Sequence, residues 1–169
     1  MSVSLTLNMS STWNESVTNS GNTTNSFSDE GIMNMQRIFS NGTGSGNMNQ
    51  QYHEYRTLAS GQSRNYDLRS VTGLVFNSVV AKTFTNVRSI GIKNYSTLTG
   101  QNVTINVTSV SGFGEPFGYP AQNINLTPNS FIGNCSPFGW GVNSGDCQIL
   151  LSNPSTGNVS YEIVIGGLS

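Results

Sequence analysis

Alternation of apolar and polar residues is the main pattern along the chain. Within 101–109, Val103, Ile105 and Val107 alternate with Asn and Thr. Successive side chains of a strand face opposite sides of a sheet, so these three residues are expected to share one buried face. The same pattern recurs near both ends of the chain, with Val3, Leu5 and Leu7 in 2–8, and Val159, Tyr161, Ile163 and Ile165 in 157–169. All three stretches are predicted to be half-buried strands.

Further stretches favour strands, and clusters of Gly, Pro, Asn or Ser separate nearly all of them. They are 35–41, 51–58, 64–68, 86–94, 122–127, 130–135 and 147–152. Only 72–84 is ambiguous. No stretch combines a long 3.6-residue apolar period with capping signals at both ends, so we expect an all-β chain.

Many short strands with frequent turn signals, in a chain of 169 residues, favour a two-sheet sandwich or a barrel. We expect an antiparallel β-sandwich of the jelly-roll type, built as one domain over 1–169. The stretches 18–29 and 42–47 have the strongest loop character. Residues 1–30 are a candidate extended N-terminal arm.

The polar positions carry very little charge. Charged residues make up 9% of the chain, against about 25% in typical soluble domains. The net charge is -1, and the seven Lys and Arg are scattered, so no basic stripe is available to neutralise phosphates. No apolar run approaches the roughly 18 residues of a membrane span, and the first residues do not resemble a signal peptide. We therefore expect neither nucleic-acid nor membrane binding, and synthesis in the cytoplasm.

The glycine-rich run Gly42 to Gly46 is a candidate phosphate loop, because glycines let backbone amides approach an anion. The spacing does not fit a dinucleotide fingerprint, a strand-like stretch follows instead of a helix, and the lysine of a P-loop is missing. A flexible connection between strands is the favoured interpretation.

The only histidine, His53, lies beside Glu54 and is the strongest candidate for a general base. If 51–58 is a strand, the two side chains point to opposite faces and cannot form a dyad. His53 then shares a face with Tyr55 and Thr57, and Glu54 shares one with Tyr52 and Arg56. A structural or contact role is therefore favoured for His53.

The remaining polar chemistry gives no site. The acidic residues are Glu15, Asp29, Glu30, Glu54, Asp67, Glu115, Asp146 and Glu162. Of these, only Asp29 and Glu30 are adjacent in sequence, and they lie in a loop-like stretch, so solvated or turn-capping roles are favoured. Cys135 and Cys147 fit no zinc pattern. They are expected to stay reduced in a cytoplasmic product, although a disulfide is open if their strands pair as a hairpin. No catalytic residue, cofactor or metal is predicted.

The stretches 37–76 and 86–94 resemble small structural proteins encoded by tailed bacteriophages and prophages. The pattern of that group is a strand, an N-G-T-G-x-G turn, an aromatic-His segment ending in R-T-L-A, and then D-L-x-x-x-T-G. The matching residues here are Asn41 to Gly46, His53, Arg56 to Ala59 and Asp67 to Gly73. In addition, 116–142 resembles a proline-rich turn, strand and P-x-G-W-x-V segment of the group, and 147–169 resembles its closing hairpin.

The resemblance implies a capsid cement or decoration protein with a jelly-roll-like fold that sits on the exterior of an icosahedral shell. It implies the major capsid protein as partner and a homo-oligomer, with a trimer favoured. The Asn- and Ser-rich first thirty residues and the two cysteines depart from the group's pattern, so no binding residue is carried over. Exposed aromatic residues such as Trp13, Tyr52 and Tyr55 would suit flat polar contacts with such a partner.

A second hypothesis is a carbohydrate- or host-binding module of a phage fibre or tail, because jelly rolls also serve as lectin domains. Aromatic residues near Trp140, Phe138 or Tyr119 would then stack on sugar rings. A small hydrolase with His53 as base is the least favoured hypothesis.

Overall fold

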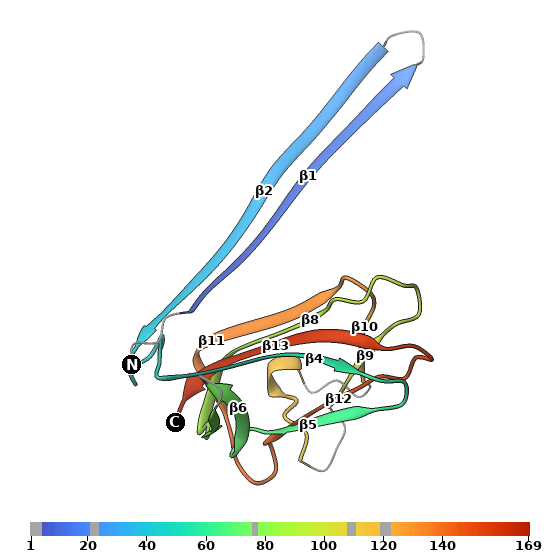
Figure 1. The fold of residues 1–169 in the computed structure, drawn as a ribbon. Coiled ribbons are helices and arrows are strands. Elements are labelled where there is room, and N and C mark those ends of the chain that lie inside the picture. The colour runs from blue at the N-terminus through green and yellow to red at the C-terminus, as the bar shows by residue number, and fades with distance from the viewer. Residues whose placement is uncertain (1–4, 21–23, 76–77, 108–110, 119–122) are drawn as a thin grey trace. The chain divides into compact units, whose positions relative to one another are not determined.

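The computed structural model describes residues 5–20, 24–75, 78–107, 111–118 and 123–169 (Figure 1). The described residues form two compact units, Leu5–Phe39 and the residues from Ser40 to Ser169. The candidate arm, residues 1–30, contributes its described residues to the first of these units.

The first unit is a long hairpin of β1 (Leu5–Ser20) and β2 (Thr24–Asn41). The two strands are antiparallel and pair without a register shift from Leu5 opposite Phe39 to Ser20 opposite Thr24. The strands predicted within 2–8 and 35–41 are confirmed for their described residues. The loop predicted over 18–29 is wrong, because β1 runs to Ser20 and β2 begins at Thr24. Asn and Ser favour turns, but the hydrogen bonds of a ladder are backbone bonds that these residues also make.

The second unit contains two four-stranded antiparallel sheets. Their strands are β4 (Gln50–Leu58), β5 (Ser63–Asp67), β8 (Asn86–Asn94), β9 (Val103–Asn106), β10 (Ile124–Leu126), β11 (Phe131–Gly141), β12 (Gln148–Ser152) and β13 (Val159–Leu168). One sheet has the order β11-β8-β13-β4 and the other β10-β9-β12-β5. The predicted strands 51–58, 64–68, 86–94, 147–152 and 157–169 are confirmed within a few residues at each end.

The pairing of these eight strands identifies the topology. The first pairs with the last, the second with the seventh, the third with the sixth and the fourth with the fifth. Pairing of β13 with β8 and of β12 with β9 completes the two sheets. This is the connectivity of a chain folded as one long hairpin and then rolled into two Greek keys. The predicted antiparallel β-sandwich of jelly-roll type is confirmed.

The connections between the eight strands are mostly short. The ambiguous stretch 72–84 forms the hairpin of β6 (Val71–Val75) and β7 (Ser78–Lys82). The two-residue strand β3 (Asn47–Met48) pairs in parallel with the end of β2. A short 3-10 helix, η1 (Glu115–Phe117), is the only helix in the described part of the chain.

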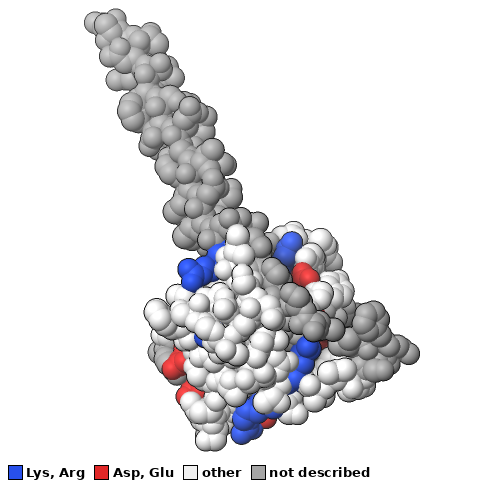
Figure 2. All heavy atoms as spheres, turned by 90° about the vertical axis from the view of Figure 1, so that its left-hand side faces the viewer, with Lys and Arg blue, Asp and Glu red and all other residues white. Residues whose placement is uncertain are grey.

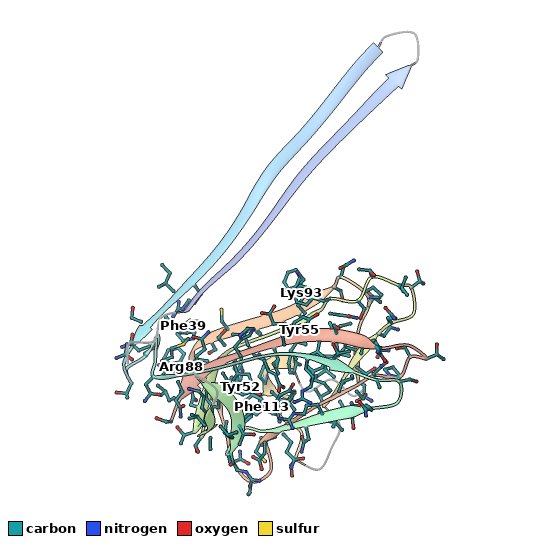
Figure 3. The ribbon with its side chains drawn as sticks, viewed as in Figure 1. Phe39, Tyr52, Tyr55, Arg88, Lys93 and Phe113 are labelled. Atoms are coloured by element: carbon teal, nitrogen blue, oxygen red, sulfur yellow. The ribbon has the colours of Figure 1, made fainter. Side chains whose placement is uncertain are left out.

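The core lies between the two sheets and follows the predicted alternation. The inward residues of β13 are fully buried, and so are those of β9. The rings of Tyr52 and Tyr66 meet edge to face at 6.0 Å between their centroids, which joins β4 of one sheet to β5 of the other. Figure 3 shows Tyr52 and Phe113 in this part of the sandwich. Burial of both inner faces leaves the outer face of each sheet for other roles.

One expectation about the C-terminal part is wrong, and the condition for a disulfide is not met. Residues 147–169 do not form a closing hairpin, because β12 and β13 belong to opposite sheets. Cys135 and Cys147 are not on paired strands either, since β11 pairs with β8 while β12 pairs with β5 and β9. Both thiols are free, and burial raises the pKa of Cys147. A jelly roll connects these consecutive strands across the sandwich, which a local pattern does not reveal.

Candidate functional site

The outer face of the β11-β8-β13-β4 sheet gathers exposed aromatic and paired polar side chains. We call it the Tyr55 face. Its residues are His53, Tyr55 and Thr57 from β4, Ser160, Glu162 and Val164 from β13, Gly91 and Lys93 from β8, Phe131 and Gly133 from β11, and Tyr95, which follows β8. These positions alternate with the core residues of the same strands, so the fold itself presents them to the outside.

One row of the Tyr55 face crosses the whole sheet. Glu162 lies opposite both Tyr55 and Lys93, and Lys93 lies opposite Phe131. The two aromatic ends of the row are open to solvent, with Tyr55 58% and Phe131 63% exposed. Large exposed aromatic side chains are the residues that most often anchor protein interfaces.

Glu162 is the centre of a polar network on this face. Its Oε1 lies 2.6 Å from Nε2 of His53, and its Oε2 accepts a hydrogen bond of 2.7 Å from the Tyr95 hydroxyl. The hydrogen bond from Tyr95 has the largest effect in holding the pKa of Glu162 below its ordinary value. The hydrogen bond with His53 and the charges of His53 and Lys93 act in the same direction. The hydrogen bond to Glu162 in turn raises the pKa of Tyr95. Glu162 is therefore an ionised acceptor at neutral pH.

The aromatic rings are held by their neighbours. The rings of Tyr55 and Tyr95 pack edge to face with centroids 5.7 Å apart. Nζ of Lys93 lies 4.3 Å from the centroid of the Tyr95 ring, within the range of a cation–π interaction. Figure 3 shows Tyr55 and Lys93 on this sheet. Because Tyr55, Tyr95 and Lys93 are already in contact with one another, fixing them in a complex would cost less conformational entropy.

A second row beside the first is built from smaller residues. Val164 lies opposite His53 and Gly91, and Gly91 lies opposite Gly133. A Cβ placed on Gly91 would meet no atom within 4 Å, so the space above this glycine is open. The Tyr55 face thus has a row of large side chains beside a row that includes two glycines.

Charge is sparse elsewhere too. On the face of the molecule drawn in Figure 2, a few Lys and Arg and a few Asp and Glu lie among uncharged residues. This agrees with the low content of charged residues in the sequence.

The predicted separation of His53 and Glu54 is confirmed, because His53 bonds to Glu162 on the outer face and Glu54 lies on the inner face of β4. The partnership of His53 with Glu162, 109 residues away, was not predicted. The sequence contains a signal for half of this result. Because Glu162 stands between the apolar Tyr161 and Ile163, alternation places it on the outer face of its strand. The pattern does not show that the strand of His53 lies next to it.

Glu54 is part of a polar cluster inside the edge of the sandwich. Its carboxylate accepts hydrogen bonds from the Tyr66 hydroxyl at 2.5 Å and from Arg56 at 3.0 Å, and Nε of Arg64 lies 3.9 Å away. Burial by itself raises the pKa of Glu54, but the hydrogen bonds and the two arginine charges outweigh it and lower that pKa. The exposed role expected for Tyr52 is wrong, since its ring is 1% exposed on this inner face.

The glycine-rich run is a turn, as predicted, and it presents acceptors instead of donors. The guanidinium of the buried Arg88 donates to the carbonyl oxygens of Thr43, Gly44 and Asn47. The amide of Gly46 donates to the Pro137 carbonyl at 3.0 Å. Carbonyl oxygens that converge on a cation are the opposite of a phosphate cradle, in which N–H groups converge on an anion.

The other predicted residues are dispersed. Trp140 is half-buried and packs against the core, whereas Phe138 is 77% exposed. Tyr119 lies outside the described residues, and the side chain of Trp13 is not described. Asp67 pairs with Arg69, and Asp146 and Asn143 bond within one turn. A hollow of about 580 Å³ near the β8–β9 and β10–β11 loops is lined only by Thr, Asn, Gly and Pro, which supply no acid or base.

The described residues hold neither a candidate metal centre nor a membrane-spanning helix. They contain no group of three or more His, Cys, Asp and Glu placed to hold a metal ion. They also contain no helix long and apolar enough to span a membrane. Comparison with protein-family models, with curated proteins and with solved structures finds no match for the chain. The bacteriophage resemblance therefore stays a prediction.

Proposed function

We propose that this protein is a non-enzymatic virion structural protein that decorates a capsid and binds the shell of the major capsid protein through the Tyr55 face. The observation that carries the proposal is the pair of exposed aromatic residues, Tyr55 and Phe131, at the two ends of one row across the open sheet face. The resemblance of residues 37–76 and 86–94 to structural proteins of tailed bacteriophages supports the choice of partner.

The chemistry of the face suits a protein surface. Exposed aromatic residues are enriched at protein interfaces, and a few such residues often supply much of the binding energy. Here Glu162 already accepts hydrogen bonds from His53 and Tyr95, so docking would not leave its carboxylate without a partner. An open sheet face also matches a broad shell surface better than a small molecule, which binds in an enclosed pocket.

The proposed mechanism is stabilisation by mass action. A ligand that binds only the assembled shell stabilises that state by RT ln(1 + [L]/Kd), or about 2.7 kcal/mol for each site at a hundredfold excess over Kd. Many copies on one shell would together oppose its expansion and rupture. No chemical step is required of the protein, in keeping with the proposed non-enzymatic role.

The proposal is tested by adding purified protein back to particles that lack it. The wild-type chain is expected to cosediment with the shell and to raise the temperature at which DNA is released. A Tyr55→Ala, Phe131→Ala double variant should lose both effects. Phe138→Ala is the matched control, because Phe138 is also exposed but lies outside the two rows, and it should bind normally. Unchanged DNA release after removal of the wild-type protein would contradict the clamping role.

A second candidate is a carbohydrate-binding module, and the exposed rings of Phe131 and Phe138 favour it, because bare aromatic rings stack on sugars. Trp140 is a weaker candidate for this role since it packs against the core. A glycan array separates the two functions. Saccharide binding that is lost in Phe138→Ala or Phe131→Ala, with no affinity for shells, would favour the module.

A further inference from the structure

The β1–β2 hairpin has two faces of different composition. Its register pairs odd-numbered positions of β1 with odd-numbered positions of β2, and even-numbered with even-numbered. Because strand residues alternate between faces, all odd positions share one side of the ribbon, which we call the odd face. The contact of the Arg37 guanidinium with the Phe39 ring, 5.7 Å to its centroid, agrees with this assignment.

The odd face is apolar over most of its length. Its apolar positions are Leu5, Leu7, Met9, Trp13, Val17, Phe27, Met33, Met35 and Phe39. On the even face every position except Ile32 and Ile38 is polar, mostly Ser, Thr or Asn. Phe39 is already buried, so the part of the odd face that needs a cover begins at the pair of Leu7 and Arg37.

A two-stranded ribbon with such a face is incomplete. An isolated hairpin is at best marginally stable in water, and a sheet with one apolar face is stabilised by a second layer about 10 Å away. Neither strand contains a proline or lysine, and the pairing shows no bulge. These are the devices that usually keep strands from associating with other chains. The ribbon therefore has the sequence of an association element.

The charges on the odd face indicate what covers it. Glu15 and Asp29 are directly opposite each other, an unfavourable arrangement of like charges. The one basic residue of the face, Arg37, lies nearer the other end, opposite Leu7. A partner that places a positive charge over the acidic pair and a negative charge over Arg37 would complement both, and a second, reversed copy of the same ribbon has this pattern.

We propose that two copies of the chain associate by stacking their odd faces with the strands running in opposite directions. The two-fold axis lies between the two ribbons, at right angles to their strands, at the level of the Ser11–Met33 pair. This register sets Arg37 of each copy over Asp29 of the other. It also sets Met35 over Gly31, where a large residue meets a position without a side chain, and Met33 over its own counterpart. Charge and size are then complementary along the same face.

Other arrangements of identical ribbons are less favourable. Parallel stacking of two copies, or a parallel three-fold bundle, sets the Glu15–Asp29 pairs against each other and brings four or more carboxylates together. Like charges directly opposite are destabilising, and more so when they are removed from water. For this ribbon the antiparallel two-fold is therefore preferred over the trimer that the bacteriophage resemblance implies.

The test uses the full-length chain in sedimentation equilibrium at a series of concentrations. Arg37→Asp and Asp29→Arg should each weaken dimerisation at least tenfold, because each creates two like-charge contacts across the two-fold. An equimolar mixture of the two variants should dimerise as well as the wild type, since every cross-copy contact is again between opposite charges. Glu30→Arg is the control, with the same charge change on the even face, and it should leave the dimer intact.

The result can also overturn the proposal. Wild-type protein that stays monomeric at high concentration, a trimer, or tighter association of Asp29→Arg alone would each contradict the antiparallel dimer. Failure of the mixture to recover, with both variants folded by circular dichroism, would contradict the register. The inference does not rest on the capsid function, because particle binding through the Tyr55 face is measured separately and either one can fail alone.

Discussion

The Tyr66 hydroxyl donates a hydrogen bond of 2.5 Å to Oε2 of Glu54 and lies 2.6 Å from the Tyr161 hydroxyl. Tyr66 belongs to one sheet, and Glu54 and Tyr161 belong to the other. This relationship joins the two layers at one edge of the sandwich with polar bonds in place of apolar packing. Burial comes first among the causes that raise the pKa of Tyr66, and burial also raises the pKa of Tyr161, to about 12.

Tyr66→Phe should therefore destabilise the protein. The substitution keeps the ring but leaves a part-buried carboxylate oxygen and a buried hydroxyl without this partner, a change that typically costs about 1–3 kcal/mol. Urea denaturation would measure the loss in the free energy of unfolding. Tyr95→Phe is the comparison, because it removes an exposed bond to Glu162, and it should cost clearly less. Equal effects of the two variants would contradict the importance assigned to the inner cluster.

Acid should weaken the fold through Glu54 and Glu162. The folded-state pKa of each lies below the ordinary value of 4.5. A depressed pKa means that the carboxylate contributes stability above the unfolded pKa and that this contribution is lost as pH falls through the folded pKa. The free energy of unfolding should thus decrease as pH falls below the ordinary glutamate pKa of 4.5. A Glu54→Gln, Glu162→Gln variant should show a shallower decrease, and an unchanged slope would contradict the assignment.

Arg88→Ala should loosen the glycine-rich turn. The substitution removes the donor shared by the carbonyl oxygens of Thr43, Gly44 and Asn47. Hydrogen bonds to a charged group are worth about 1.5–3 kcal/mol, so a loss of that order in the free energy of unfolding is expected. Hydrogen exchange should also become faster at the amides of 42–47. Protection unchanged from wild type would show that the turn does not depend on Arg88.

Gly167→Ala should be among the most damaging single substitutions in the chain. The ladder between β13 and β8 shifts register at Gly166 and Gly167, and a Cβ on Gly167 would collide with the backbone oxygen of Asn86. Overpacking of this kind costs about 1–3 kcal/mol or more, because the backbone itself must move. Gly91→Ala is the matched control on the neighbouring strand β8, with open space around the new methyl group. It should be neutral or slightly stabilising, as measured by thermal unfolding.

The fold was predictable from sequence to a useful level because burial is regular. Val159, Tyr161, Ile163 and Ile165 alternate without interruption, and each is buried as the period of two requires. The strand pairs were not predictable, since Glu162 meets Tyr55 and Lys93 only after the chain has rolled up. The same reason explains why the expected hairpin of β12 and β13 was wrong. A jelly roll places these two consecutive strands in opposite sheets.

The candidate site was predictable only in part. Alternation was enough to separate His53 from Glu54, and it placed Tyr55 with His53. It did not tell which face of 51–58 is buried, because Tyr52 and Tyr55 are chemically alike and the charged Glu54 and Arg56 share the face of the buried Tyr52. The inner face of β4 holds Glu54 and Arg56 because Tyr66 and Tyr161, from distant stretches, supply their environment.

The most direct test of the proposed function is a reconstruction of purified particles from the host that encodes this chain. The proposal predicts density for the jelly roll on the outside of the shell, in fixed stoichiometry with the major capsid protein, with Tyr55 and Phe131 against that protein. Density confined to a tail fibre, or particles that lack the chain altogether, would contradict it.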